Sequence, residues 1–136
     1  MSYGQPDQRL RLLSVFFNGL LGVLKAEPLD DSEEIRNYMR SGSAENNYRR
    51  GRWKSFYAIL VDPNINEVIS AEAPPALGAG YPTGSTESGL TRVYPINSSN
   101  EERVWRNSFE TGRRLAETGK LIRSNGGMIK QRIHHR

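Results

Sequence analysis

The sequence contains no cysteine. This absence excludes disulfides, thiolate zinc sites, iron–sulfur clusters and thiol nucleophiles. Histidine is almost as scarce, since the only two are His134 and His135 at the end of the chain. A Ser-His-Asp relay or a histidine general base needs an ordered histidine inside the domain. We therefore expect no catalytic residues of these kinds, no metal site and no cofactor, and the chain is predicted to bind rather than to catalyse.

Long hydrophobic runs are also absent. The most apolar stretch, residues 12–24, is shorter than the roughly 18 to 20 residues that span a bilayer. Its helical spacing predicts a buried core helix within residues 7–25, with a membrane-interfacial helix as the alternative. We expect no transmembrane segment and no secretory signal, so the location would be cytoplasmic, or the virion if the protein is viral.

The length of 136 residues fits one domain, which we expect over 1–136 with a basic tail at 128–136. An acidic cluster at residues 30–34 has capping-box spacing between Asp31 and Glu34, and it predicts the start of a second helix. A divalent-metal site is the alternative reading of these carboxylates.

A last helix is predicted from a second capping box, Ser99 and Glu102, and from an apolar stripe of helical spacing made by Trp105, Phe109, Leu115 and Ile122. Gly112 and Gly119 would let this helix pack closely, and Gly126-Gly127 would end it.

One segment favours strands. Apolar and β-branched residues alternate up to Val61, and Asp62-Pro63-Asn64 has the chemistry of a turn, so residues 67–71 would return as the second strand of a hairpin. Helix through Leu60 is the competing interpretation.

Residues 72–98 are rich in proline and glycine and predict a long loop, with one further strand expected within 90–96. A loop of this length is typically functional or disordered, and a partner or neighbouring copies would hold it in order. The predicted fold is mainly α, a small bundle of three to four helices with a short β hairpin, with α+β as the alternative.

Charge is unevenly distributed within the net +4. Residues 36–54 carry six cationic side chains and one acid, whereas residues 62–98 carry four acids and one arginine. In the first stretch, cations alternate with aromatic rings. Single-stranded nucleic acid is bound by such a combination, because cations follow the phosphates while rings stack on bases. The predicted contact residues are Tyr48, Arg49, Arg50, Arg52, Trp53 and Lys54, with Arg113 and Arg114 as an extension if the last helix packs nearby.

Three other interpretations of this segment remain. It could be a basic loop whose Trp53 and Tyr48 anchor the core, or it could face an acidic protein or a lipid surface. On the nucleic-acid interpretation, Gly51 would let a phosphate approach the main chain. By analogy of traits, the sequence predicts a non-enzymatic, self-assembling coat or nucleocapsid-type subunit, whose partners are single-stranded nucleic acid, RNA favoured, and copies of itself. The alternatives are a protein–protein adaptor without nucleic-acid contact, and a small carboxylate-dependent nuclease using the cluster Asp30, Asp31, Glu33 and Glu34.

Overall fold

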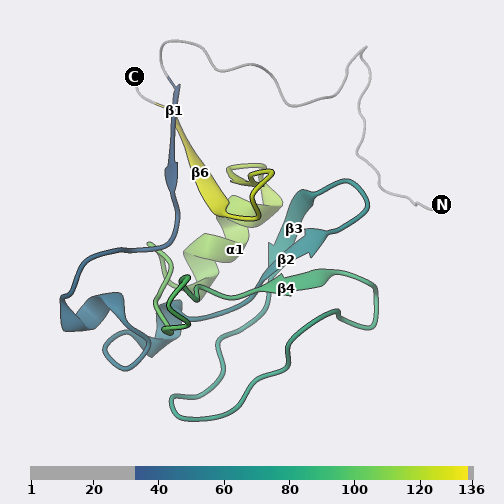
Figure 1. Ribbon diagram of the computed structural model, residues 1–136. Helices are drawn as coiled ribbons and strands as arrows, with labels where there is room; N and C mark the ends of the chain where they lie inside the picture. Colours follow the sequence, from purple (N-terminus) through teal and green to yellow (C-terminus); the bar gives the residue numbers. More distant parts are fainter. Residues whose placement is uncertain (1–32, 135–136) are drawn as a thin grey trace, which may run out of the picture. The chain divides into compact units, whose positions relative to one another are not determined.

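The computed structural model describes residues 33–134, which fall in one structural unit and are mostly β (Figure 1). Six short strands make two antiparallel, three-stranded sheets. The first sheet has the order β1 (Glu33–Asn37), β6 (Ile129–His134), β5 (Leu121–Arg123). The second has the order β3 (Glu67–Ala71), β2 (Ile59–Asp62), β4 (Thr91–Val93). The helical elements of this part of the chain are α1 (Phe109–Glu117) and two single 3-10 turns, η1 (Glu45–Asn47) and η2 (Trp53–Ser55).

The predicted helical bundle is wrong, because only 15% of the residues are helical and a single α-helix is present among those described. The helix predicted from the acidic cluster is replaced, over Glu33–Asn37, by strand β1. A cap contributes only about 1 kcal/mol, and a helix here would have no apolar face to bury, since four of the five residues are exposed. Antiparallel pairing with β6 instead satisfies this backbone, matching Glu33 with His134 and Asn37 with Lys130.

The last helix is shorter than predicted and begins later. Ser99 and Glu102 do not cap it; the helix starts after Ser108 and covers only residues 109–117. Residues 102–105 are extended and bridge to distant segments, Trp105 to Met39 among them. The apolar character of Trp105 therefore reflects burial in extended backbone, where its Nε1 donates to a carbonyl 2.7 Å away. The helix ends at Glu117, two residues before Gly119, whose φ of +76° disfavours any residue with a Cβ.

The predicted hairpin is confirmed. β2 and β3 pair antiparallel, and the backbone N–H of Asn64 donates to the carboxylate of Asp62 at 2.9 Å in the connecting turn. The first strand of the hairpin covers only Ile59–Asp62. The short strand expected within residues 90–96 is present as β4, which pairs with the other edge of β2. Local turn chemistry thus identified the hairpin, whereas the pairing of β4 with β2 was not predicted.

The end of the predicted last helix, including Ile122, forms strand β5 instead, and the residues beyond it form β6. Gly126-Gly127, expected to end that helix, lies in the turn between β5 and β6. Residues 129–134, expected to belong to a basic tail, form the central strand of the first sheet. The predicted helix at 7–25 lies outside the described residues, as do Asp30 and Asp31. Within residues 33–134, no helix is long and apolar enough to cross a membrane.

The core lies where α1 packs against β3 and β5 (Figure 1). Tyr38 stacks on Trp105, with ring centroids 5.6 Å apart, and Tyr57 reaches under the helix. Gly112 of α1 provides the space, because a Cβ built there would lie 1.8 Å from the Tyr57 hydroxyl oxygen. Gly112, which the sequence predicted to allow close packing of the helix, therefore makes room for the buried Tyr57 side chain.

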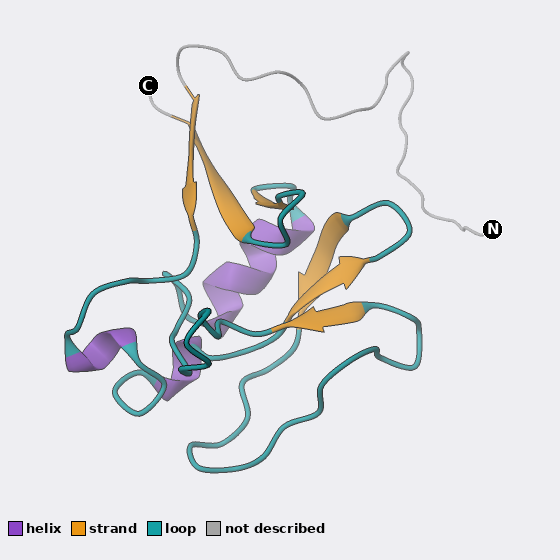
Figure 2. Cartoon of the chain, viewed as in Figure 1, coloured by secondary structure: helices purple, strands orange, loops and turns teal. Residues whose placement is uncertain are grey.

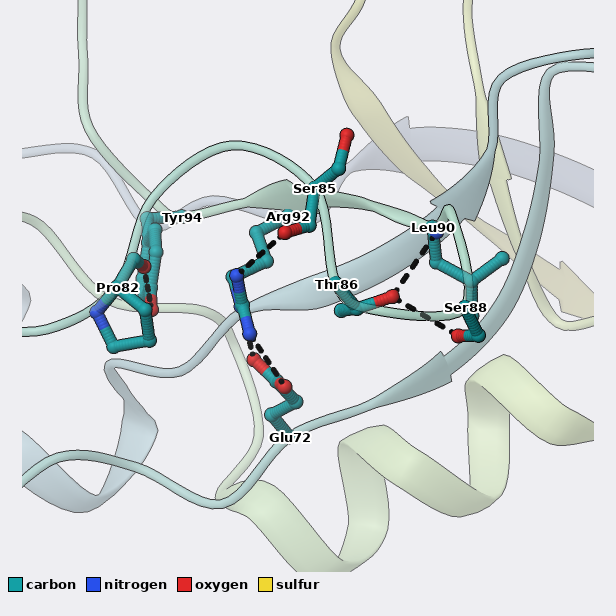
Figure 3. A network of polar contacts seen from close by, with 8 residues as sticks. All are labelled: Glu72, Pro82, Ser85, Thr86, Ser88, Leu90, Arg92 and Tyr94. Carbon is teal, nitrogen blue, oxygen red and sulfur yellow. Dashed lines mark hydrogen bonds and ion pairs between the residues drawn. The ribbon is translucent and has the colours of Figure 1, made fainter.

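The long loop between β3 and β4, at the foot of Figure 2, is held by contacts within the chain. Arg92 on β4 grips the Glu72 carboxylate with two nitrogens, at 2.8 and 3.3 Å, and donates a third bond to the Ser85 carbonyl (Figure 3). The Tyr94 hydroxyl donates to the Pro82 carbonyl at 2.7 Å. The order of this loop therefore needs no partner chain.

Candidate functional site

Arg49 fixes the same loop from its other side. It is 6% exposed, and its Nη2 donates to the carbonyls of Ala76 and Ala79, each at 2.9 Å. Its Nη1 forms an ion pair with Glu102 at 3.2 Å. These contacts occupy the terminal nitrogens of the guanidinium, so Arg49, although a predicted nucleic-acid contact, binds the chain itself.

Aromatic rings complete the surroundings of Arg49. Its guanidinium carbon lies 4.7 Å from the ring centroid of Phe56 and 5.1 Å from that of Tyr81. The Tyr81 hydroxyl donates to the Glu102 carboxylate at 2.6 Å. Burial, followed by this hydrogen bond, raises the pKa of Tyr81 to about 12. The whole group is a structural anchor between the loop and the segment that carries Phe56, which leads from η2 into β2.

Tyr48 occupies a different position, at a half-buried site on the surface. The guanidinium carbons of Arg50 and Arg103 lie 4.2 and 4.3 Å from its ring centroid. The Arg103 side chain is buried and bonded to the carbonyls of residues 40 and 42, which fixes it under the ring. The Arg50 side chain is 61% exposed and also pairs with the exposed Glu45. One arginine therefore supports the ring while the other remains open to solvent.

Arg52, Trp53 and Lys54 follow at η2. Arg52 and Trp53 are half-buried and Lys54 is exposed, with its Nζ 5.8 Å from the Trp53 ring centroid. The core tryptophan is Trp105, which is 2% exposed, and Trp53 does not belong to the buried cluster. Within the described part of the chain, neither Arg52 nor Lys54 forms an ion pair. Arg52 and Lys54 thus carry positive charge that no described carboxylate pairs with, and Lys54 lies beside the Trp53 ring.

Gly51 has a steric role in this segment. A Cβ built on it would lie 2.3 Å from the carbonyl oxygen of Glu45, inside the contact distance of any real side chain. The turn 48–51 packs so closely on η1 that only glycine fits. The structure thus accounts for Gly51 without a phosphate.

Arg113 and Arg114 stand apart from this surface. Both are exposed on α1, and Arg113 pairs with Glu117 at 3.2 Å, four residues along the helix. Glu117 in turn accepts a hydrogen bond from Ser70 on β3. No hydrogen bond or ion pair among residues 33–134 connects either arginine to segment 48–54. The structure therefore does not join α1 to the predicted interface.

The carboxylates of the acidic cluster that fall in β1 are not arranged as a metal centre. Glu33 pairs with Arg132 at 3.0 Å and lies 3.9 Å from His134. Within the described part of the chain, no three His, Asp or Glu side chains gather closely enough to hold a metal ion. Glu33 here joins neighbouring strands of the first sheet.

Neither Arg103, which supports the Tyr48 ring, nor Arg106 is among the residues that the sequence predicts for the site. Both lie on the extended segment that bridges to residues 39 and 48. Only the long-range pairing of this segment could have identified them, because their sequence neighbours have helical spacing of opposite charges.

The resulting surface consists of Tyr48, Arg50, Arg52, Trp53 and Lys54, and is called here the basic–aromatic surface. It offers guanidinium and ammonium donors together with aromatic faces. These groups can bind phosphates and stack on planar rings. Comparisons of the chain with protein-family models, with curated proteins and with solved structures found no match.

Proposed function

We propose that this protein binds single-stranded nucleic acid, RNA in preference, through the basic–aromatic surface. The observation that carries the proposal is the Arg50 guanidinium, which lies 4.2 Å from the Tyr48 ring centroid while its side chain is 61% exposed. A guanidinium plane supported by a ring on one side can stack on a base with its other side. Bases splayed from a single strand are the ligands that such platforms bind.

The charges beside this platform support the same ligand. Arg52 and Lys54 have no carboxylate partner among the described residues, so their charge is available to backbone phosphates. Phosphate neutralisation releases counterions from the nucleic acid and supplies most of the affinity of sequence-independent binding. We expect weak dependence on base sequence, because phosphate contacts and stacking carry little base information.

Assembly into a coat or nucleocapsid-type particle is a separate part of the proposal. Its sequence basis is the apolar stretch 12–24, outside the described residues. Light scattering after size exclusion, with the ratio of nucleic-acid to protein absorbance, measures assembly and bound nucleic acid together. A monomer at every concentration would contradict the assembly part and leave the binding part standing.

Fluorescence anisotropy with a labelled single-stranded RNA, repeated over a series of salt concentrations, tests the binding. The log–log slope of affinity against salt should be about −0.7 for each phosphate contacted. Arg52→Ala and Lys54→Ala should each make the slope shallower and weaken binding to different sequences alike. Arg114→Ala is the matched control, because Arg114 is an exposed arginine that does not belong to the basic–aromatic surface. An equal loss with the control would mean diffuse charge attraction and would contradict a defined interface.

A protein–protein adaptor is the second candidate, and a hollow of about 410 Å³ on the long loop favours it. Two tyrosine rings and two prolines make most of the lining, which also includes a carboxylate: Tyr81, Tyr94, Pro75, Pro82, Ala73 and Glu72. Proline-rich peptides dock on aromatic grooves of this character. Titration of the protein with a proline-rich peptide that carries one basic residue tests the adaptor function. Saturable binding of this peptide by a protein that does not bind RNA would favour the adaptor.

A further inference from the structure

Among residues 33–134, three arginines near the end of β1 differ from Arg103 and Arg123, which also donate through a terminal nitrogen, because their one side-chain hydrogen bond is made by Nε. Each is anchored through its Nε to a neutral acceptor: Arg36 to the Gln131 side chain at 3.4 Å, Arg40 to the Asn47 side chain at 2.7 Å, and Arg106 to the Asn37 carbonyl at 2.7 Å. We call these three residues the arginine triad. Anchoring at Nε leaves the two terminal nitrogens of each guanidinium, the forked end that grips phosphate bidentately.

Backbone pairing brings the triad together from distant positions. The N–H of Arg106 donates to the Tyr38 carbonyl, and the N–H of Arg40 donates to the Val104 carbonyl, each at 2.9 Å. Arg106 thereby lies opposite the middle of the segment that carries Arg36 and Arg40. Burial, and then repulsion by Arg36 and Arg40, lowers the pKa of the Arg106 guanidinium. The positive charges of Arg36 and Arg40 are thus close enough to disfavour the charged form of Arg106.

No carboxylate of residues 33–134 relieves this repulsion. Among residues 33–134, none of the triad forms an ion pair. Five other arginines in the same part of the chain do pair with glutamates: Arg49, Arg50, Arg92, Arg113 and Arg132. Holding three like charges together with only neutral acceptors costs free energy, and an anion at the forked ends would offset that cost.

We propose that Arg36, Arg40 and Arg106 form a phosphate-binding site for one backbone phosphate of the same nucleic-acid strand. This inference rests on the proposed function and gives the strand a path. The triad borders the basic–aromatic surface, because Asn47, which orients Arg40, directly precedes Tyr48. Arg103 also links the two, donating to the Arg40 carbonyl at 3.2 Å while its guanidinium carbon lies 4.3 Å from the Tyr48 centroid. A phosphate on the triad therefore precedes or follows a base stacked at Tyr48.

The experiment measures RNA binding by the full-length protein and by two variants of the triad. Arg36→Gln/Arg106→Gln removes two of the charges, and Arg106→Lys keeps the charge but removes the fork. The double variant should make the salt slope shallower by about 0.7, one phosphate contact, and should weaken binding about tenfold or more. Arg106→Lys should weaken binding with little change in slope. Arg114→Gln is the matched control and should alter neither value.

A neutral linkage in the RNA identifies the phosphate itself. Oligonucleotides carrying a single methylphosphonate at successive positions should include one position that weakens binding by the wild type and not by the double variant. Equal affinity and slope for wild type and double variant would overturn the triad site while leaving the proposed function in place. No RNA binding by the wild type would overturn both. Circular dichroism confirms that each variant is folded before its binding is compared.

Discussion

Replacement of Arg49 by alanine should destabilise the protein strongly, whereas the same change at its neighbour Arg50 should not. The change removes the ion pair with Glu102 and the two bonds to the carbonyls of Ala76 and Ala79. Removing one partner of a buried ion pair costs about 3 to 5 kcal/mol. The Glu102 side chain is 40% exposed, so water can replace the lost arginine on that side. We therefore expect the lower end, about 3 kcal/mol.

A loss of this size is a large part of the total stability of a domain, which is about 5 to 15 kcal/mol. For a unit of roughly 100 residues it lowers the melting temperature by about 10 to 20 °C. Urea unfolding followed by circular dichroism measures the free-energy loss, and Arg50→Ala should leave the midpoint unchanged. Limited proteolysis gives a second measurement, because loss of the carbonyl bonds should expose residues 72–80 to cleavage. Equal stability of the Arg49→Ala and Arg50→Ala variants, with equal proteolysis, would refute the anchoring role.

Three further predictions follow from packing and ionisation. Gly112→Ala should destabilise the protein by about 1 to 3 kcal/mol because the new methyl overlaps the Tyr57 hydroxyl, despite a helix-propensity gain of at most about 1 kcal/mol; a stabilised variant in thermal unfolding would contradict this. Trp53→Ala should weaken RNA binding while the melting temperature stays nearly constant, whereas Trp105→Ala should cost about 3 to 5 kcal/mol of stability; the reverse pattern would place Trp53 in the core. Folding raises the pKa of Tyr81 from about 10 to about 12. The neutral Tyr81 hydroxyl therefore stabilises the folded state fully below about pH 10, and this contribution is lost as pH rises toward about 12. A urea midpoint that stays constant over that range would contradict this prediction.

The hairpin was predictable because its information is local. The turn chemistry at Asp62 and Pro63 lies directly between two runs of alternating residues, and both strands are within ten residues of it. β1 was not predictable in this way. Its partner β6 lies about a hundred residues along the chain, and pairing Glu33 with His134 leaves no mark in the neighbouring sequence. The acidic residues there gave a helix-cap signal that long-range pairing overrode.

The same distinction explains the errors at segment 99–108. The spacing of Trp105 and Phe109 is helical, but Trp105 is buried through an extended bridge to Met39 and a hydrogen bond to the Tyr57 carbonyl. An apolar residue at i and another at i+4 do not show which backbone carries them. Only the residues after Ser108, where α1 does form, have the periodicity and the helical backbone together.

The candidate site shows a similar limit for charged residues. Arg49 and Arg50 are adjacent and chemically identical, so the sequence assigns both to phosphate contact. One is buried against carbonyls from the long loop, and the other is exposed above Tyr48. Their difference depends on residues 27 to 53 positions away, which the composition of the segment does not contain.

The number of guanidinium nitrogens already bonded within the chain, rather than the number of cations, therefore separates structural arginines from candidate ligand-binding ones. Arg49 and Arg92 meet carboxylates and carbonyls of the chain, and each ties the long loop in place. Arg106 meets only a neutral acceptor and two other arginines, an arrangement that contributes nothing favourable to folding through charge. Folding alone does not explain such a group, whereas the negative charge of a bound phosphate would offset the repulsion between these arginines. On this argument, neutralising Arg106 should stabilise the free protein or leave it unchanged while weakening RNA binding, and a variant that loses both stability and binding in proportion would contradict it.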